Sequence, residues 1–443
     1  MVVDELFVKK GSEFLPIDSL DNQMIDEIVY EGESYHFAKQ KDLTGTSKIE
    51  ADNGVDEPII SLGVTGNTVQ DGTPTPELPI PIQNTNDNGM SIVLHGTNLA
   101  TARDMYSKKS GATFVDVLDE ATGEIRHCAR FMCTTLKYTI QGGFKENTQY
   151  TVSFVRASAP ESTSNPQPFC FWYTDGTFQM VGWKSSTDYT FTKATAKSEA
   201  GKTVQYIGIY NWNSKAFAYV DVNTFILQEG AITDPVYEPY FREEITIPES
   251  IDVSGTNVPL VLAKYVSARP QSYPTILYDT ITVDKLSNKV VFRAYTVKYA
   301  ITGNESSWYS SLSGHIMAYA SNLIGIQMTT PYGYCNQFTL EHFTGALKDY
   351  RFANSTVIIF KLPNSPTVEE YKAFFQQQYE NGTPVELQLP RKTPIEYDLT
   401  NTDLGQQLLA LATHKGTNYL EITSNLEPTQ TDLSYWRQVI PNE

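Results

Sequence analysis

The chain has 443 residues, of which 40% are hydrophobic and only 19% are charged, and its formal net charge is −18. This length suits two to four domains, and the hydrophobic content excludes a disordered chain. The acidic balance argues against nucleic acid as a partner, because phosphate binding needs clusters of Lys and Arg that are missing here. The 27 Tyr and 21 Phe favour strands and predict a β-rich protein.

Residues 1–60 are the most acidic part, with fourteen Asp and Glu against five Lys and Arg. Within this range, residues 19–30 are compatible with a short acidic helix. We expect 1–60 to form an attachment region that folds or docks separately from the rest. Its first residues lack the basic start and apolar run of a signal peptide, so we expect synthesis in a cytoplasm without conventional export. The sequence contains no stretch of about twenty apolar residues, so we expect no membrane insertion.

Residues 61–87 are rich in proline, at positions 74, 76, 79 and 81. Each proline fixes φ and removes a backbone donor, so this stretch must run extended and cannot lie inside a regular sheet. The sequence therefore predicts a stiff connector between the acidic region and the rest of the chain.

Residues 88–245 show short apolar and aromatic runs separated by Gly, Asn, Asp and Ser turns, a spacing typical of a β-sandwich or jelly roll. Residues 148–154 alternate strictly, with Tyr150, Val152 and Phe154 on one face. The expected strands are 91–94, 131–140, 148–157, 169–173, 178–183, 189–192, 204–210 and 218–228.

Residues 246–400 predict a second β-rich sandwich with one helix at 367–380. Thr367 and Glu370 have the spacing of a capping box, and Asn381-Gly382 provide residues that tolerate the end of a helix. Residues 401–443 predict a short α/β tail, with a helix near 402–411 and a strand near 417–423. A Gly-Thr-Asn triplet begins at Gly96 and again at Gly255, which allows the two sandwiches to be related repeats.

Several segments resemble tail and baseplate proteins of phages of Gram-positive bacteria, with a carbohydrate-binding-module-like sandwich of the family 4/9 type. The segments are Gly66 to Pro76, Gly96-Thr97-Asn98-Leu99, GFKENTQYTVSF, LQEGAITDPVYEPY and LGQQLLAL with KGTNYLEITSNLEP. The resemblance implies a virion protein with two jelly-roll-like sandwiches. It also implies contacts to other virion proteins through the N-terminal region, a homotrimer, and host cell-wall carbohydrate as the ligand. Relatives of this type carry a structural calcium ion, for which the sequence assigns no residues.

Catalytic patterns are missing from the sequence. The acidic residues stand in no recognisable glycosidase pair, no Ser lies in a nucleophile elbow, and no phosphate-binding loop occurs. His127-Cys128 with Cys133 is a weak metal pattern, and free thiols are the better interpretation of the four Cys. We therefore expect a protein that is not an enzyme.

Carbohydrate binding needs aromatic rings that stack on the C–H face of a sugar, together with amide or hydroxyl groups that bind its hydroxyls. A buried core position is the alternative for each aromatic residue, favoured for Trp172 and Trp183, whereas an exposed site is favoured for Tyr210 and Trp212. The candidate residues are Trp172, Tyr173, Trp183, Tyr210, Asn211, Trp212, Asn213, Trp308 and Tyr309.

The sequence therefore favours a structural component of a phage tail or baseplate that binds carbohydrate without catalysis. The first alternative is a purely structural virion protein, in a tail, neck or head fibre, whose sandwiches contact neighbouring proteins. The second is a glycan hydrolase, which would require two carboxylates about 5–10 Å apart in an open groove.

Overall fold

The chain is mainly β, as predicted, and divides into two compact units. Unit 1 consists of Met1–Val93, Glu244–Lys415 and Leu420–Glu443, and unit 2 of Leu94–Glu243 and Gly416–Tyr419. The computed structural model describes residues 7–10, 13–16, 27–30, 33–40, 49–53, 59–108, 112–132, 135–158, 167–181, 191–210, 217–266, 276–305, 308–310, 316–318, 333–340, 351–354, 358–362, 367–414 and 416–438.

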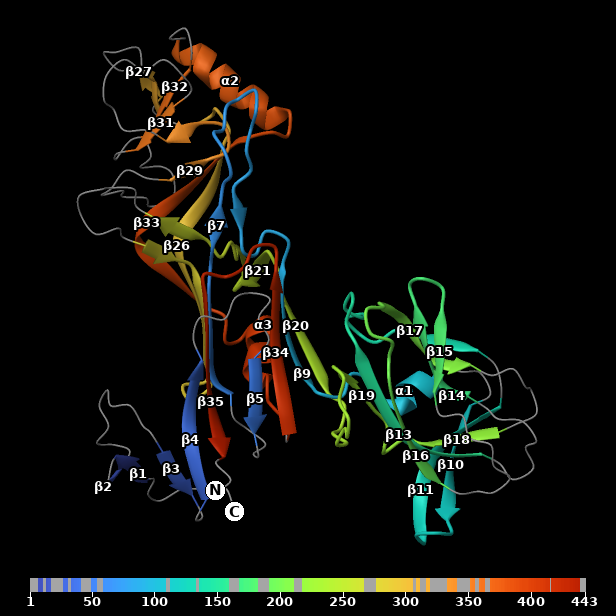
Figure 1. Ribbon diagram of the computed structural model, residues 1–443. Helices are drawn as coiled ribbons and strands as arrows, with labels where there is room; N and C mark the ends of the chain where they lie inside the picture. The colour runs from blue at the N-terminus through green and yellow to red at the C-terminus, as the bar shows by residue number, and fades with distance from the viewer. Residues whose placement is uncertain are drawn as a thin grey trace. The chain divides into compact units, whose positions relative to one another are not determined.

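Unit 2 contains two antiparallel sheets, drawn from cyan to green in Figure 1. The first sheet has the order β10 (Thr113–Asp119), β11 (Glu124–Met132), β18 (Phe217–Asp221), β13 (Tyr150–Ser158) and β16 (Thr192–Lys197), and β19 (Ile226–Glu229) also pairs with β13. The second sheet has the order β12 (Leu136–Tyr138), β17 (Val204–Tyr210), β14 (Gln167–Tyr173) and β15 (Phe178–Val181). A short helix, α1 (Ala102–Ser107), precedes β10.

The core of unit 2 is formed by alternate residues of both sheets. Phe154 of β13 and Phe169 of β14 both contact Phe225, with ring centroids about 6 Å apart. Tyr150, Val152 and Phe154 are all buried in this core, as the alternation of residues 148–154 predicts. The two sheets therefore enclose one hydrophobic core, the arrangement of a β-sandwich.

Unit 1 is built on a long antiparallel sheet. Its order is β2 (Glu13–Pro16), β1 (Phe7–Lys10), β3 (Glu27–Tyr30), β4 (Glu33–Gln40), β35 (Gln430–Gln438), β6 (Ile59–Thr65), β25 (Thr280–Asp284), β26 (Lys289–Ile301), β33 (Val385–Asp398) and β29 (Tyr334–Cys335). A further sheet has the order β27 (Tyr309–Ser310), β28 (Ile316–Ala318), β32 (Ile358–Lys361), β31 (Arg351–Asn354) and β30 (Thr339–Leu340).

Smaller sheets complete the described strands. One has the order β20 (Arg242–Ile247), β9 (Met90–Gly96), β34 (Gly416–Ser424) and β5 (Ile49–Asn53). The two-stranded sheets are β21 (Ser250–Val253) with β22 (Thr256–Pro259), β23 (Lys264–Val266) with β24 (Ile276–Tyr278), and β7 (Thr68–Val69) with β8 (Gln83–Asn84).

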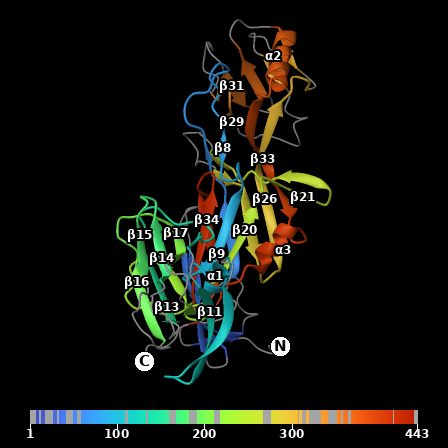
Figure 2. The same cartoon turned by 90° about the vertical axis from the view of Figure 1, so that its right-hand side faces the viewer.

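Two helices belong to unit 1. Helix α2 (Val368–Glu380) begins at the predicted capping box, in which Thr367 and Glu370 bind each other's backbone N–H groups. It buries Tyr371 and Phe375 in a core with residues of β26 and β33, and it lies near β29 and β31 at one end of unit 1 in Figures 1 and 2. Helix α3 (Asp403–Ala410) is capped by Thr402. Both helices lie where the sequence predicts them.

The proline-rich segment 61–87 is packed onto unit 1. Its first residues lie in β6, in the middle of the long sheet, whereas all four prolines fall between β7 and β8 and outside any strand. The Gln70 side chain donates to the carbonyl oxygens of Ile80 at 3.0 Å and Cys335 at 2.8 Å. The Ile80 N–H donates to Asn336 O at 2.8 Å. The bond between Gln70 and Ile80 lies within the segment, whereas the bonds to Cys335 and Asn336 attach the segment to the sheet around β29.

The two units divide the chain differently from the predicted ranges. Unit 2 lies close to the range 88–245 but also includes Gly416–Tyr419. The ranges 1–60, 61–87 and 246–400 and the rest of 401–443 fall in unit 1. The short helix predicted at 19–30 is wrong at residues 27–30, which form β3, and its first part lies outside the described residues. The two Gly-Thr-Asn triplets hold different places: Gly96 ends β9, whereas Gly255 lies in the turn between β21 and β22.

Candidate functional site

The outer face of the second sheet of unit 2 carries a group of aromatic side chains. Strand β14 alternates, so Phe169, Phe171 and Tyr173 enter the core. Cys170 and Trp172 occupy the intervening positions and therefore belong to the opposite face. In the strand register, Phe178 of β15 and Tyr206 of β17 lie directly across from Trp172. Alternation thus places several large rings on one surface.

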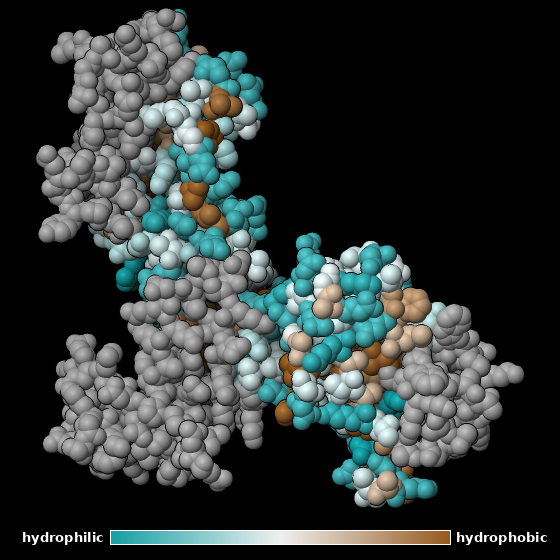
Figure 3. Space-filling view, viewed as in Figure 1, coloured by the Kyte–Doolittle hydropathy of each residue, from teal (hydrophilic) through white to brown (hydrophobic). Residues whose placement is uncertain are grey.

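We call this surface the aromatic face and define it as Trp172, Phe178, Met180, Tyr206 and Tyr210. The ring centroid of Tyr210 lies 4.7 Å from that of Phe178 and 6.4 Å from that of Trp172. Phe178 is 40% exposed and Met180 43% exposed, whereas Trp172 is only 6% exposed. Figure 3 shows tan and brown residues at the position of β14 and β15 on unit 2. The face therefore combines a buried ring with rings that solvent reaches.

A glycine and a lysine complete this surface. Gly208 has a φ of +146°, and a Cβ atom there would lie 2.2 Å from the carbonyl oxygen of Leu136. Only glycine allows β12 to approach β17 so closely. The approach places Lys137 opposite Gly208, with its Nζ atom 5.8 Å from the ring centroid of Trp172 and 5.3 Å from that of Tyr206. The aromatic face thus carries an exposed ammonium group.

This arrangement can bind a ligand that has both an apolar face and polar groups. Aromatic rings on a sheet are preformed, so little conformational entropy is lost when a ligand stacks on them. The hydroxyl groups of Tyr206 and Tyr210 can donate and accept hydrogen bonds, and the ammonium of Lys137 can donate three. Sugars match this combination because their ring C–H groups are apolar and their edges carry hydroxyls.

The structure brings two of the candidate residues together and separates another from them. Trp172 and Tyr210 both lie on the aromatic face. Tyr173 lies in the core and is 2% exposed; its hydroxyl donates to Gln179 Oε1 at 2.7 Å and accepts from the Glu199 N–H at 2.8 Å. Burial raises the pKa of Tyr173. Tyr173 therefore serves the packing of unit 2.

Of the other candidates, Trp308 does not belong to this group. Trp308 lies in unit 1, where its ring stacks on Phe375 at a centroid distance of 5.2 Å and contributes to the core beneath α2. Tyr309 is placed only as the first residue of β27. Trp183, Asn211, Trp212 and Asn213 lie outside the described residues.

Four residues of this surface were not among the candidates: Lys137, Phe178, Met180 and Tyr206. Strand alternation together with strand pairing places these four residues on the surface. Each lies directly across from Trp172, Cys170 or Gly208 on the neighbouring strand. The alternation can be read in the sequence, but the pairing cannot.

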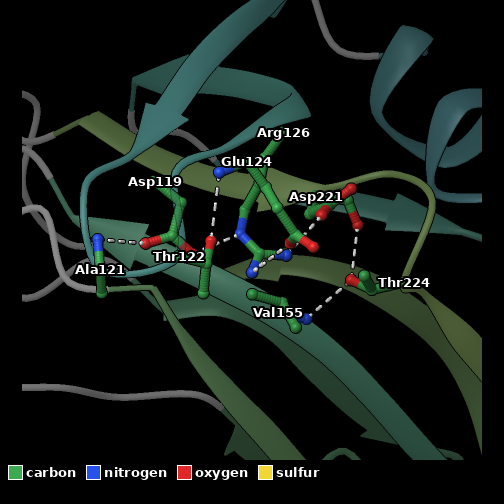
Figure 4. A network of polar contacts seen from close by, with 8 residues as sticks. All are labelled: Asp119, Ala121, Thr122, Glu124, Arg126, Val155, Asp221 and Thr224. Atoms are coloured by element: carbon green, nitrogen blue, oxygen red, sulfur yellow. Dashed lines mark hydrogen bonds and ion pairs between the residues drawn. The ribbon is translucent and has the colours of Figure 1, made fainter.

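The first sheet of unit 2 carries a polar network that sequence reasoning also missed (Figure 4). Arg126 of β11 donates to Asp119 at 2.7 Å and to Asp221 at 3.1 Å, and Glu124 lies 3.4 Å away. The side chains of Asp119 and Asp221 are only 4% and 6% exposed. The hydrogen bond from Arg126 holds the pKa of Asp119 below its usual value. The network ties the turn of the β10–β11 hairpin to the end of β18.

The structural calcium ion that the resemblance allows can be compared with this network. Among the described residues of unit 2, Asp119 and Asp221 are the buried carboxylates, and both already accept hydrogen bonds from the guanidinium of Arg126. A calcium ion requires six to eight oxygen ligands, so these residues do not fit it. Among the residues that the structure describes, no group of three or more His, Cys, Asp or Glu side chains is placed to hold a metal.

A cavity in unit 1 contains several carboxylates. It has a volume of about 630 Å³ and is lined by Ile251, Asp252, Val253, Ser254, Asp398, Asn401, Thr402, Asp403 and Leu404. All three Asp side chains are exposed. Hydrogen bonds from Thr400 lower the pKa of Asp398. The cavity therefore presents solvent-exposed carboxylates rather than the buried acid that protonates a glycosidic oxygen.

Cys128, Cys170 and Cys335 are free and buried. Burial raises the pKa of each thiol to about 12. Reactive cysteines need a low pKa and access to solvent, so these three are packing residues. The expectation of free thiols is confirmed for them, whereas Cys133 lies outside the described residues.

No family model, characterised protein or solved structure shows a significant match to this chain. The resemblance to phage tail proteins therefore remains a prediction from the sequence segments that carry it.

Among the helices that the structure describes, none has the length and apolar character needed to span a membrane.

Proposed function

We propose that this chain is a structural protein of a phage tail or baseplate that binds host cell-surface carbohydrate without cleaving it. The aromatic face carries the binding part of the proposal, because it offers several rings and an ammonium group on one preformed sheet. The virion part rests on the resemblance of the segment from Gly66 to Pro76. The same resemblance supports a homotrimer that contacts other virion proteins through its N-terminal region.

The exposure of the aromatic face supports a ligand. Phe178 and Met180 occupy successive outward positions of β15, and both leave about two fifths of their surface in water. Single exposed hydrophobic residues are common on soluble proteins, but neighbouring ones beside Tyr210 form a patch of the kind that marks binding sites. The solvent-facing rings are therefore the groups that a sugar would cover.

The proposal can be tested with purified cell walls of Gram-positive bacteria and the full-length chain in a sedimentation assay. Phe178→Ala should weaken binding about tenfold or more, because a buried Phe side chain contributes about 1.5–3 kcal/mol. Phe114→Ala is the matched control, since Phe114 is 39% exposed in the same unit but lies on the other sheet. Binding by neither wild type nor control, or equal loss in both variants, would contradict the proposal.

A purely structural role is the second candidate, and one observation favours it. Leu118 and Ile125 lie directly opposite each other in the β10–β11 hairpin and are 57% and 65% exposed. An apolar pair at the tip of a hairpin can insert into a neighbouring protein. Leu118→Asp should then disrupt assembly into the virion and leave wall binding unchanged, whereas Phe178→Ala should do the reverse.

A further inference from the structure

Building on the proposed carbohydrate binding, we infer that the ligand is anionic: a sugar chain that carries phosphate or carboxylate groups, selected by Lys137. Lys137 is the middle residue of β12 and its side chain is exposed. Its ammonium lies within 6 Å of the ring centroids of both Trp172 and Tyr206. The positive charge is thus part of the aromatic face.

The charge of Lys137 is not neutralised by the described part of the chain. The described contacts of its ammonium are those with the two rings, and it forms no ion pair with a described carboxylate. Three other lysines of unit 2 do form ion pairs: Lys145 lies 3.0 Å from Glu229, Lys193 lies 3.0 Å from Asp234, and Lys202 lies 2.8 Å from Glu199. Within the described part of unit 2, the charge of Lys137 is therefore not paired with a carboxylate and can act on a ligand.

The residues around Lys137 also favour an anionic ligand. The outward positions of β12, β14, β15 and β17 carry aromatic, apolar and glycine residues and the exposed Gln205 beside Lys137, and no described one is acidic. In the whole chain, by contrast, 51 Asp and Glu outnumber 33 Lys and Arg. A neutral sugar can accept hydrogen bonds from this ammonium but gains no attraction between opposite charges. An anionic sugar gains a charge-assisted hydrogen bond while its ring stacks on the neighbouring aromatic residues.

The net negative charge of the chain does not prevent this recognition. At physiological salt the Debye length is about 8 Å, so carboxylates elsewhere on the surface are largely screened from a ligand at Lys137. A direct contact with Lys137 is screened much less. The local charge therefore decides the preference of the face.

The test uses three preparations of the same Gram-positive cell walls. One is untreated, one is treated with hydrofluoric acid to cleave phosphodiesters, and one is amidated with carbodiimide to neutralise carboxylates. Wild type should bind untreated walls about ten- to hundredfold more tightly than the preparation that lacks the recognised anion. A treatment that lowers the affinity of wild type but not that of Lys137→Met identifies phosphate or carboxylate as the anion, because release of the whole sugar chain would lower both.

Variants separate this inference from the proposed function. Lys137→Met should lose the preference for untreated walls, Lys137→Arg should largely keep it, and Lys193→Met is the control for a lysine on the other sheet. Phe178→Ala should weaken binding to all three preparations. If Lys137→Met binds like wild type, or if neither treatment lowers affinity, the inference is wrong and carbohydrate binding still stands. If wild type binds none of the walls, the proposed function fails and the inference fails with it.

Discussion

Trp172 and Tyr173 are consecutive residues of β14 whose side chains lie on opposite faces of the sheet. Tyr173 belongs to the core of unit 2, whereas the ring of Trp172 lies near Tyr210 and Lys137 on the outer face. Both residues were candidates for carbohydrate binding on residue type and local sequence alone. The alternation of the strand separates their roles. A variant of Tyr173 should therefore affect stability, whereas a change on the outer face should affect binding.

Tyr173→Phe should destabilise unit 2 without changing carbohydrate binding. The variant removes the hydroxyl that bonds Gln179 and the Glu199 N–H, at 2.7 Å and 2.8 Å. The loss should be about 1 kcal/mol in the free energy of unfolding, measured by urea denaturation. Wall binding, measured under native conditions, should equal that of wild type. A loss of binding as large as that of Phe178→Ala would show that Tyr173 contacts the ligand.

Gly208→Ala should distort the aromatic face. The new Cβ would lie 2.2 Å from Leu136 O, and the φ of +146° is strained for any other residue. Together these effects should cost about 3 kcal/mol or more and displace β12, which carries Lys137. Gly201→Ala is the control, because its φ is +75° but nothing lies within 4 Å of the new Cβ. It should cost about 1–2 kcal/mol and keep binding; equal effects of both variants would contradict the close approach of β12.

Much of the local structure could be predicted from sequence because it depends on near neighbours. The expected strand 204–210 coincides with β17, and the capping box at Thr367 begins α2. Both follow from patterns within a few residues. The strand at 27–30 was missed, although Ile28 and Val29 are β-branched, because the three-to-four spacing of apolar residues there also suits a helix.

The pairing of strands could not be predicted in the same way. β6 lies between β25 and β35, so Val64 is paired with Ile281 and Thr431, which are far away in the sequence. Local patterns do not identify such partners. For the same reason the sequence indicated Trp172 and Tyr210 as candidates but did not show that Lys137 and Phe178 lie beside them.

Arg126→Met should destabilise the β10–β11 hairpin strongly. It leaves Asp119 and Asp221 buried without their cation, and an unpaired buried charge is unfavourable. The triple variant Arg126→Met, Asp119→Asn, Asp221→Asn should recover much of the melting temperature, because it removes the buried charges as well. Lys193→Met, which breaks an exposed pair with Asp234, should shift the melting temperature little. An equally small shift in Arg126→Met would show that the network does not stabilise the hairpin.

Asp279 should make the folded state of unit 1 more stable at low pH. Its side chain is buried, with the residue 1% exposed, and it joins three segments of the chain. Its carboxylate accepts from the N–H groups of Ala263, Tyr295 and Thr296, at 3.0, 2.6 and 2.9 Å, and from the Thr296 hydroxyl. Replacement by Asn puts an NH₂ group against these donors and should cost about 1–3 kcal/mol.

Burial raises the pKa of Asp279 against the opposing effect of these hydrogen bonds. Because the pKa is higher in the folded state, protonation favours folding. The resulting stabilisation is complete below the unfolded pKa of about 3.9 and is lost as the pH rises through the folded pKa. Asp279→Asn does not titrate at this position, so the advantage of wild type over the variant should shrink as the pH rises. Urea unfolding of both proteins across pH 3–8 measures this difference; an advantage that grows with pH would show that the hydrogen bonds outweigh burial.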